Sequence, residues 1–169
     1  MDYILNRRSV RSFNDKKISD NDLVSLTRYA EAAPSARAQK GRAYIIINDM
    51  EQIKKLSEVS IGAGVLTRSN AKACIAVIGK DMNKISTPAM LPSDLAAATE
   101  NILLKACEMG IGSCWIGIYP EHERMTRASE ILNLGNNEFV FSLIALGYPS
   151  DDEAFFDAKK QIDVSFNRR

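Results

Sequence analysis

The sequence predicts an α+β fold, and two features of its apolar pattern support this class. Segments with the apolar spacing of amphipathic helices alternate with short apolar segments rich in β-branched residues. The connections between these segments vary in length, which argues against the regular alternation of a doubly wound parallel sheet. We therefore expect helices packed against a sheet rather than a uniform βαβ repeat.

The first half of the chain predicts a helix, a strand and a second helix. Ser19 is a suitable N-cap, an acid follows three residues later at Asp22, and the helical spacing continues until Pro34. Residues 43–48 are β-branched and bounded by turn formers, so they predict a strand. Asp49 can then cap a short helix.

The middle of the chain predicts a central strand and a long helix. Residues 73–79 are apolar at both alternating sets of positions, as in a strand covered on both faces. Residues 93–109 predict a helix that is apolar nearly all round, which indicates burial in the core or against another subunit. Gly110 is placed to end this helix, and residues 113–118 predict an extended strand.

The chain closes with a helix, a strand and a tail. Pro120 begins a helix that stops near Gly135, and residues 139–146 predict the last strand. We expect residues 1–149 to form the domain. Residues 150–169 show no strong period and change from acidic to basic, so we expect a tail extended along the domain or the partner subunit.

Composition and charge exclude several classes of function. The 169 residues are 46% hydrophobic and 25% charged, which describes one ordinary globular domain. The 22 Lys and Arg against 21 Asp and Glu leave a formal charge of +1, whereas a general nucleic-acid binder needs a large basic surplus. The sequence contains no apolar stretch of about 18 residues, the length that a membrane-spanning helix needs. The start of the chain lacks a secretion signal, so we expect a cytoplasmic protein.

Cysteine and histidine are too few for several common kinds of site. Cys74, Cys107 and Cys114 are odd in number without a Cys-x-x-Cys pair, and His122 is the single histidine. This composition weakens a disulfide framework, a zinc site or a histidine-activated nucleophile. His122 lies among charged residues at a helix start, so we interpret it as solvent-facing.

The densest basic cluster is Arg7-Arg8-Ser9-Val10-Arg11. In an extended segment Arg7, Ser9 and Arg11 share one face, because alternate side chains point the same way. Guanidinium groups on both sides of a hydroxyl can hold an anion, since their forked donors match phosphate oxygens. Taken alone, the cluster is also typical of a solvated basic patch.

Two further segments could admit a ligand. Small residues follow a helix end at positions 32–36, where a flat ligand could approach the main chain. The segment Gly-Ile-Gly-Ser-Cys-Trp-Ile-Gly at 110–117 contains three glycines. It matches neither a dinucleotide-binding Gly-x-Gly-x-x-Gly nor a P-loop, and Trp115 alone is most often a core residue.

Together these segments resemble the nitroreductase family, in order and spacing along nearly the whole chain. The matching motifs are Arg-Arg-Ser-x-Arg at 7–11, Ala-Pro-Ser-Ala at 33–36, Glu-Asn-Ile-Leu-Leu at 100–104, the glycine-rich 110–117 and Ala-Leu-Gly-Tyr-Pro at 145–149. The resemblance implies a nitroreductase-like fold with a mixed central sheet flanked by helices. It also implies a homodimer with two FMN molecules at the subunit interface, so that the long helix 93–109 would be a buried interface helix.

The resemblance further implies which residues contact FMN. The first contact would come from the amino-terminal cluster, with two side chains toward the phosphate and the last toward the pyrimidine edge: Arg7, Ser9 and Arg11, together with Arg8. The partner subunit would supply Pro34, Ser35 and Ala36. An extended segment would run beside the isoalloxazine with an amide near N5: Trp115, Ile116 and Gly117. Lys159 and Lys160 match, by distance alone, a late basic pair at the phosphate.

The chemistry implied by the resemblance belongs to the flavin. NADH or NADPH would deliver a hydride to FMN N5, and electrons would pass to a nitroaromatic, quinone or related acceptor. Arg11 would stabilise negative charge on the reduced flavin, and no catalytic side chain or metal is assigned.

One departure from the family pattern leaves alternatives open. Many relatives continue Pro-Ser-Ala to an Asn and then Gln-Pro-Trp, whereas this chain has Ala38, Lys40, Gly41 and Arg42. A polar flavin contact and an aromatic anchor are therefore missing. The alternative is a flavin-binding or flavin-sequestering protein with little turnover. A third hypothesis, outside the family, is a small module whose basic cluster binds another anion.

Overall fold

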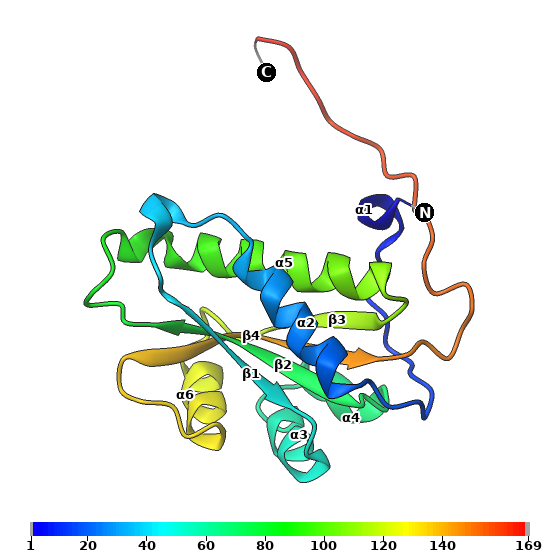
Figure 1. Cartoon of the computed structure of the whole chain (residues 1–169), viewed down its shortest axis with the longest axis horizontal. Coiled ribbons are helices and arrows are strands. Elements are labelled where there is room, and N and C mark those ends of the chain that lie inside the picture. The colour runs from blue at the N-terminus through cyan, green and yellow to red at the C-terminus, as the bar shows by residue number, and fades with distance from the viewer. Residues whose placement is uncertain (1, 168–169) are drawn as a thin grey trace.

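The computed structural model describes residues 2–167 and contains the predicted helices and strands in the predicted order (Figure 1). The helices are α1 (Tyr3–Asn6), α2 (Asp20–Glu31), α3 (Met50–Ser57), α4 (Val65–Arg68), α5 (Leu91–Glu108) and α6 (His122–Ile131). The strands are β1 (Arg42–Ile47), β2 (Ala73–Lys80), β3 (Gly112–Gly117) and β4 (Glu138–Gly147). The predicted caps are confirmed, since the Ser19 hydroxyl accepts from the amide of Asp22 at 3.1 Å and the Asp49 carboxylate accepts from Gln52 at 2.7 Å.

The four strands form one sheet in the order β1-β2-β4-β3, and every neighbouring pair is antiparallel. The predicted mixed sheet is therefore wrong, although the α+β class is confirmed. The reason is topological. β2 and β3 run in the same direction and are joined through α5, but β4 lies between them and pairs with both. Among residues 2–167, the parallel contact is an isolated bridge between Ser9 and Ser113.

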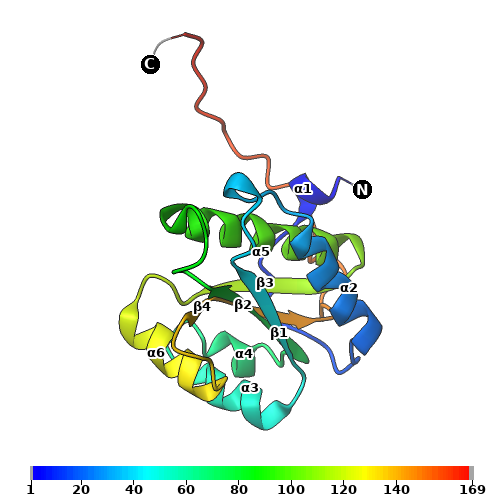
Figure 2. The same cartoon turned by 60° about the vertical axis from the view of Figure 1, so that its left-hand side comes forward.

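Helices cover both faces of this sheet. Figures 1 and 2 show α2 and α5 on one face, with α3, α4 and α6 on the other. Each face has its own apolar core, and β2 contributes alternate side chains to the two cores. All residues of β2 except Lys80 are buried, so the predicted central position of this strand is confirmed.

The long helix α5 is buried along its sheet side but not all round. Its buried residues include Leu95, Ile102 and Ala106, whereas Ala97 and Leu104 on other faces remain partly exposed. A single chain therefore leaves part of this apolar helix uncovered.

The amino-terminal segment is held by an aromatic ring that fills a socket between two glycines. Gly112 and Gly147 lie opposite each other in β3 and β4, and the ring of Phe13 lies over both. A Cβ at position 147 would be 2.5 Å from Cγ of Phe13, and one at position 112 would be 2.9 Å from Cγ1 of Val10. Phe13 is only 3% exposed. Gly112 thus makes room for this segment rather than for a ligand.

The tail after β4 first packs against the domain and then extends away from it (Figure 1). Ala154 and Phe155 pack against the core, and the ring of Phe156 lies 4.7 Å from the guanidinium carbon of Arg8. The side chains of Ile162, Val164 and Phe166 are 66–89% exposed. Among the described residues, no helix is both long and apolar enough to cross a membrane.

We predict that Gly147→Ala destabilises the protein by about 1–3 kcal/mol, because the added methyl group would force Phe13 out of its packed position. Gly135→Ala is the matched control, since its Cβ would meet only a carboxylate oxygen of Glu138 at 3.6 Å. Chemical denaturation of both variants measures the difference. Equal free energies of unfolding for the two variants would contradict the tight packing of Phe13 against Gly147.

Candidate functional site

The basic amino-terminal cluster lies beside the edge strand β3. The amide of Val10 donates to the carbonyl of Ser113 at 2.9 Å, next to the Ser9–Ser113 bridge. Arg7 turns toward α5, where its Nε lies 3.1 Å from Oε1 of Glu100. Only part of the cluster is therefore free to face a ligand within one chain.

Arg8 makes its contacts inside the chain. Its guanidinium donates to the carbonyl of Leu5 at 2.9 Å and to that of Arg7, and it stacks on Phe156. Its Nε is buried and has no hydrogen-bond partner among the described residues. Arg8 thereby joins the end of α1 to the start of the tail.

A groove of about 400 Å³ lies where this cluster meets β3, α4 and α6. The structure brings together four residues assigned from the sequence and six others, lining the groove with Arg11, Ser60, Gly62, Val65, Arg68, Cys114, Trp115, Ile116, Gly117 and Arg124. These residues come from four separate parts of the chain. The groove thus brings Arg11 together with the predicted segment 115–117.

The groove is positively charged. Its lining contains three arginines and no acid. Arg11 donates to the carbonyl of Ser9 and Arg68 to that of Ile61, each at 3.2 Å. Within residues 2–167, neither these two side chains nor Arg124 forms an ion pair with a carboxylate. Unpaired guanidinium groups on a partly enclosed wall suit an anionic ligand or a developing negative charge.

One wall of the groove is the edge strand β3, with Trp115 half-buried on it. The ring of Trp115 lies 6.1 Å from that of Phe141 in a tilted arrangement. A Cβ at Gly117 would meet nothing within 4 Å, so the space beside this residue is open. On an edge strand, alternate backbone N–H and C=O groups point away from the sheet. This wall therefore offers the outer edge of a strand and the open space at Gly117, while the ring of Trp115 packs toward the α5 side of the sheet.

The opposite wall of the groove was not predicted from the sequence. Ser60 and Gly62 belong to the small-residue segment Ser-Ile-Gly-Ala-Gly at 60–64, which is a signal that could have found it. Gly64 makes room there for the guanidinium of Arg68, which a Cβ would contact closely. Arg124 carried no such signal, because a charged residue is ordinary on the exposed side of a helix.

The remaining predicted contacts lie elsewhere in the chain. Pro34, Ser35 and Ala36 follow α2 at the other end of the domain, and no hydrogen bond or ion pair between described residues links them to the groove (Figure 1). Lys159 and Lys160 are exposed on the extended tail. One chain does not bring either group to the groove.

The three thiols are buried, and burial raises the pKa of each. The pKa of Cys74 rises to about 12 in the sheet. Burial also raises the pKa of Cys114, which lines the groove, although nearby Arg11 opposes the shift. Arg7 and Arg8 lower the pKa of Cys107, but burial raises this pKa by more. Residues 2–167 contain no group of three or more His, Cys, Asp or Glu side chains that could hold a metal ion.

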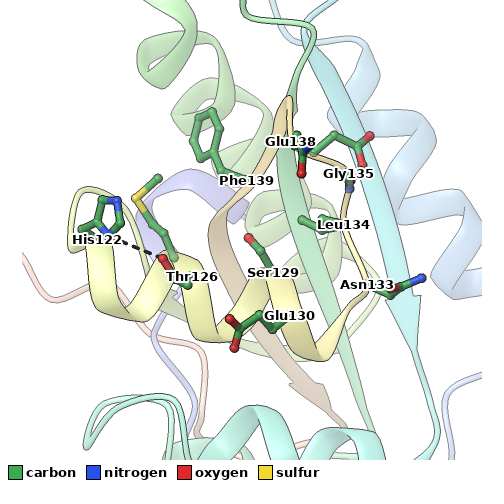
Figure 3. Close-up of a pocket in the computed structure, with 11 residues that line it drawn as sticks. His122, Thr126, Ser129, Glu130, Asn133, Leu134, Gly135, Glu138 and Phe139 are labelled. Atoms are coloured by element: carbon green, nitrogen blue, oxygen red, sulfur yellow. Dashed lines mark hydrogen bonds between the residues drawn. The ribbon is translucent and has the colours of Figure 1, made fainter.

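A larger hollow of about 620 Å³ lies along α6 and the start of β4 (Figure 3). His122 is exposed at its rim, with Nδ1 3.4 Å from the hydroxyl of Thr126, as expected for a solvent-facing residue. Glu138 in this hollow already accepts from the amide of Gly135 at 3.1 Å. Of the residues assigned from the sequence to ligand contacts, none lines it.

Known proteins resemble this chain in both sequence and fold. A family model described as "Putative TM nitroreductase" matches residues 1–168. An Archaeoglobus fulgidus protein named "Putative NADH dehydrogenase/NAD(P)H nitroreductase" is 41% identical over 155 residues, which are 92% of this chain and 88% of that protein. A Bacillus subtilis protein named "FMN reductase (NADPH)" is 26% identical over 165 residues, covering 88% of this chain and 65% of that protein.

The solved structures agree with this grouping. The crystal structure of a Clostridium acetobutylicum protein named "Putative NADH Oxidase" superposes with a TM-score of 0.88 and 36% identity, over 95% of each chain. This α+β domain therefore shares the fold of proteins named for NADH oxidase and NAD(P)H nitroreductase activity. The chain belongs to the nitroreductase family.

We predict that the native thiols react slowly with an aromatic disulfide reagent at pH 8 and that all three react after unfolding. A raised pKa keeps each thiol protonated, and the thiolate is the reactive form. The reaction of the native protein should accelerate only at a pH above the pKa of free cysteine. Cys114→Ser identifies the contribution of the groove thiol. Rapid labelling of the native protein at neutral pH would contradict the burial of all three.

Proposed function

We propose that this protein is an FMN-dependent oxidoreductase that accepts a hydride from NADH or NADPH and reduces a nitroaromatic, quinone or related acceptor. The observation that carries the proposal is the groove in which Arg11, Trp115, Ile116 and Gly117 meet. The family relationship supports it, because relatives are named for NAD(P)H and FMN chemistry.

The residues of the groove fit FMN. Three guanidinium groups that have no carboxylate partner among residues 2–167 match an anionic cofactor, while the open space beside Gly117 suits a planar ring. When bound, FMN supplies the hydride and electron transfer that no side chain here provides. Arg11 would stabilise negative charge at the pyrimidine edge, and the backbone of residues 115–117 would orient the ring.

We propose that the working unit is a homodimer, with Pro34, Ser35 and Ala36 completing the partner's cofactor site. In one chain these residues lie away from the groove, so a second copy must bring them there. The surface near α1, α2 and α5 exposes large apolar side chains, with Tyr3, Ile4 and Tyr29 37–71% exposed beside Leu104. Such a patch favours a protein interface.

We also propose that the tail lies along the domain or the partner, where Lys159 and Lys160 could approach the phosphate together with Arg7, Arg8 and Ser9. Phe156 of the tail lies against Arg8, which belongs to the basic cluster. Three free cysteines fit a reducing, cytoplasmic setting.

The proposal predicts that the purified protein binds FMN, shows flavin absorbance and is bleached by NADH or NADPH. Arg11→Ala should weaken FMN binding by roughly tenfold or more, because it removes a charge-assisted contact. Arg127→Ala is the control, since this residue lies outside the groove and pairs with Glu123 at 3.9 Å. A colourless protein that cannot be loaded with FMN would overturn the proposal. Stoichiometric FMN that neither nicotinamide reduces would support the flavin-sequestering alternative instead.

The dimer proposal predicts a particle of about twice the 18.7 kDa chain mass by light scattering. Leu104→Glu should shift this mass toward the monomer and weaken FMN binding, because it places a charge in the apolar surface of α5. Met82→Glu, on an exposed loop, is the control. A wild-type monomer at low micromolar concentration would contradict the dimer.

A further inference from the structure

A buried polar cluster joins the 34–39 segment to the start of α5. Asp94 is only 6% exposed and Gln39 only 7%. The Asp94 carboxylate accepts from the amide of Ala36 at 2.9 Å and from Nε2 of Gln39 at 2.6 Å. Oε1 of Gln39 in turn accepts from the amide of Thr87 at 3.1 Å and from its hydroxyl at 2.9 Å. The cluster therefore ties three separate segments together.

This cluster holds a turn whose backbone is unfavourable by itself. Arg37 and Ala38 both adopt left-handed backbone angles, with φ of 51° and 53°. Two consecutive residues with a Cβ rarely adopt this conformation without support from their surroundings. The supports lie immediately on both sides of the turn, at the amide of Ala36 and the side chain of Gln39.

The carboxylate has no cation partner in this cluster. Among residues 2–167, Asp94 forms no ion pair, and it lies in the first turn of α5, where the helix N-terminus favours negative charge. Its two hydrogen-bond donors both come from the 36–39 segment. The buried acid is thus dedicated to the geometry of that segment.

We infer that Asp94 and Gln39 are positioning residues that hold residues 34–36 in the conformation required for the cofactor. This inference rests on the proposed function, in which that segment contacts FMN in the partner. Gln39 adjoins the positions where the chain departs from the family pattern, and it points inward to Asp94 rather than toward a ligand. Asp94 and Gln39 therefore stabilise a turn whose own residues, Arg37 and Ala38, do not favour its backbone angles.

The direction of each hydrogen bond gives a sharp test. In Asp94→Asn, the new side-chain amide can still accept from Ala36, but its NH₂ group faces the NH₂ group of Gln39. In Gln39→Glu, two carboxylates face each other. In the double variant, the new amide at position 94 donates to the new carboxylate at position 39, which still accepts from both donors of Thr87. The double variant therefore restores the hydrogen bond between positions 94 and 39, whereas the 3.3 Å hydrogen bond from Nε2 of Gln39 to the carbonyl of Thr87 stays lost.

We expect each single variant to weaken FMN binding roughly tenfold and to alter the visible circular dichroism of bound flavin, with the double variant binding FMN more tightly than either single variant. Glu108→Gln, at the exposed far end of α5, is the control. Hydrogen exchange of residues 34–40, measured without flavin, should be faster in both single variants and slow again in the double variant.

Three outcomes decide the inference. Rescue of exchange, affinity and flavin spectrum together supports it. Single variants with wild-type affinity and spectrum, or a double variant no better than the singles, overturn it while leaving the proposed function intact. A wild-type protein that binds no FMN overturns the proposed function and the inference with it.

Discussion

The packing of α5 against the sheet sets the positions of the segments around it. This helix contacts β2, β3 and β4 through a buried apolar stripe, and its Thr99 hydroxyl lies 3.1 Å from that of Ser142 inside the core. Because the helix is rigid, segments that hydrogen-bond or pair with its side chains are kept at a fixed distance from one another. Asp94 at one end holds the turn after α2, and Glu100 near the middle holds Arg7. Two of the proposed cofactor segments, 7–11 and 34–36, are thus held by one helix.

The glycines of the 110–117 segment show how similar residues serve different purposes. Gly110 has φ of 70° and ends the chain's longest helix in a left-handed turn. Gly112 makes space for Val10 and Phe13, which holds the basic cluster beside β3. Only Gly117 borders open space in the groove. β3 ends there because the next two amides, of Ile118 and Tyr119, both donate to the carbonyl of Phe141.

The net charge of the chain differs from the local charge of the groove. The near-neutral total of +1 arises because acids elsewhere balance the basic residues. Seven ion pairs join many of these charges to one another among the described residues. Arg11, Arg68 and Arg124 are left out of such pairs and lie together in the groove. This local surplus suits one small anionic cofactor rather than a polyanion.

Elements whose causes are local could be predicted from the amino-acid sequence alone. The Ser19 and Asp49 caps, the apolar strand 73–79 and the stop at Gly110 depend on neighbouring residues, so their positions follow from spacing and chemistry. Sequence order also indicated Arg11 and Trp115 as site residues, through motifs that the family shares. Other features arise only on folding. The insertion of β4 between β2 and β3 made the sheet antiparallel. Arg68 and Arg124 come from distant parts of the sequence and meet in the groove, and Asp94 contacts Gln39 across 55 positions. Such contacts exist only once α5 and the sheet have packed.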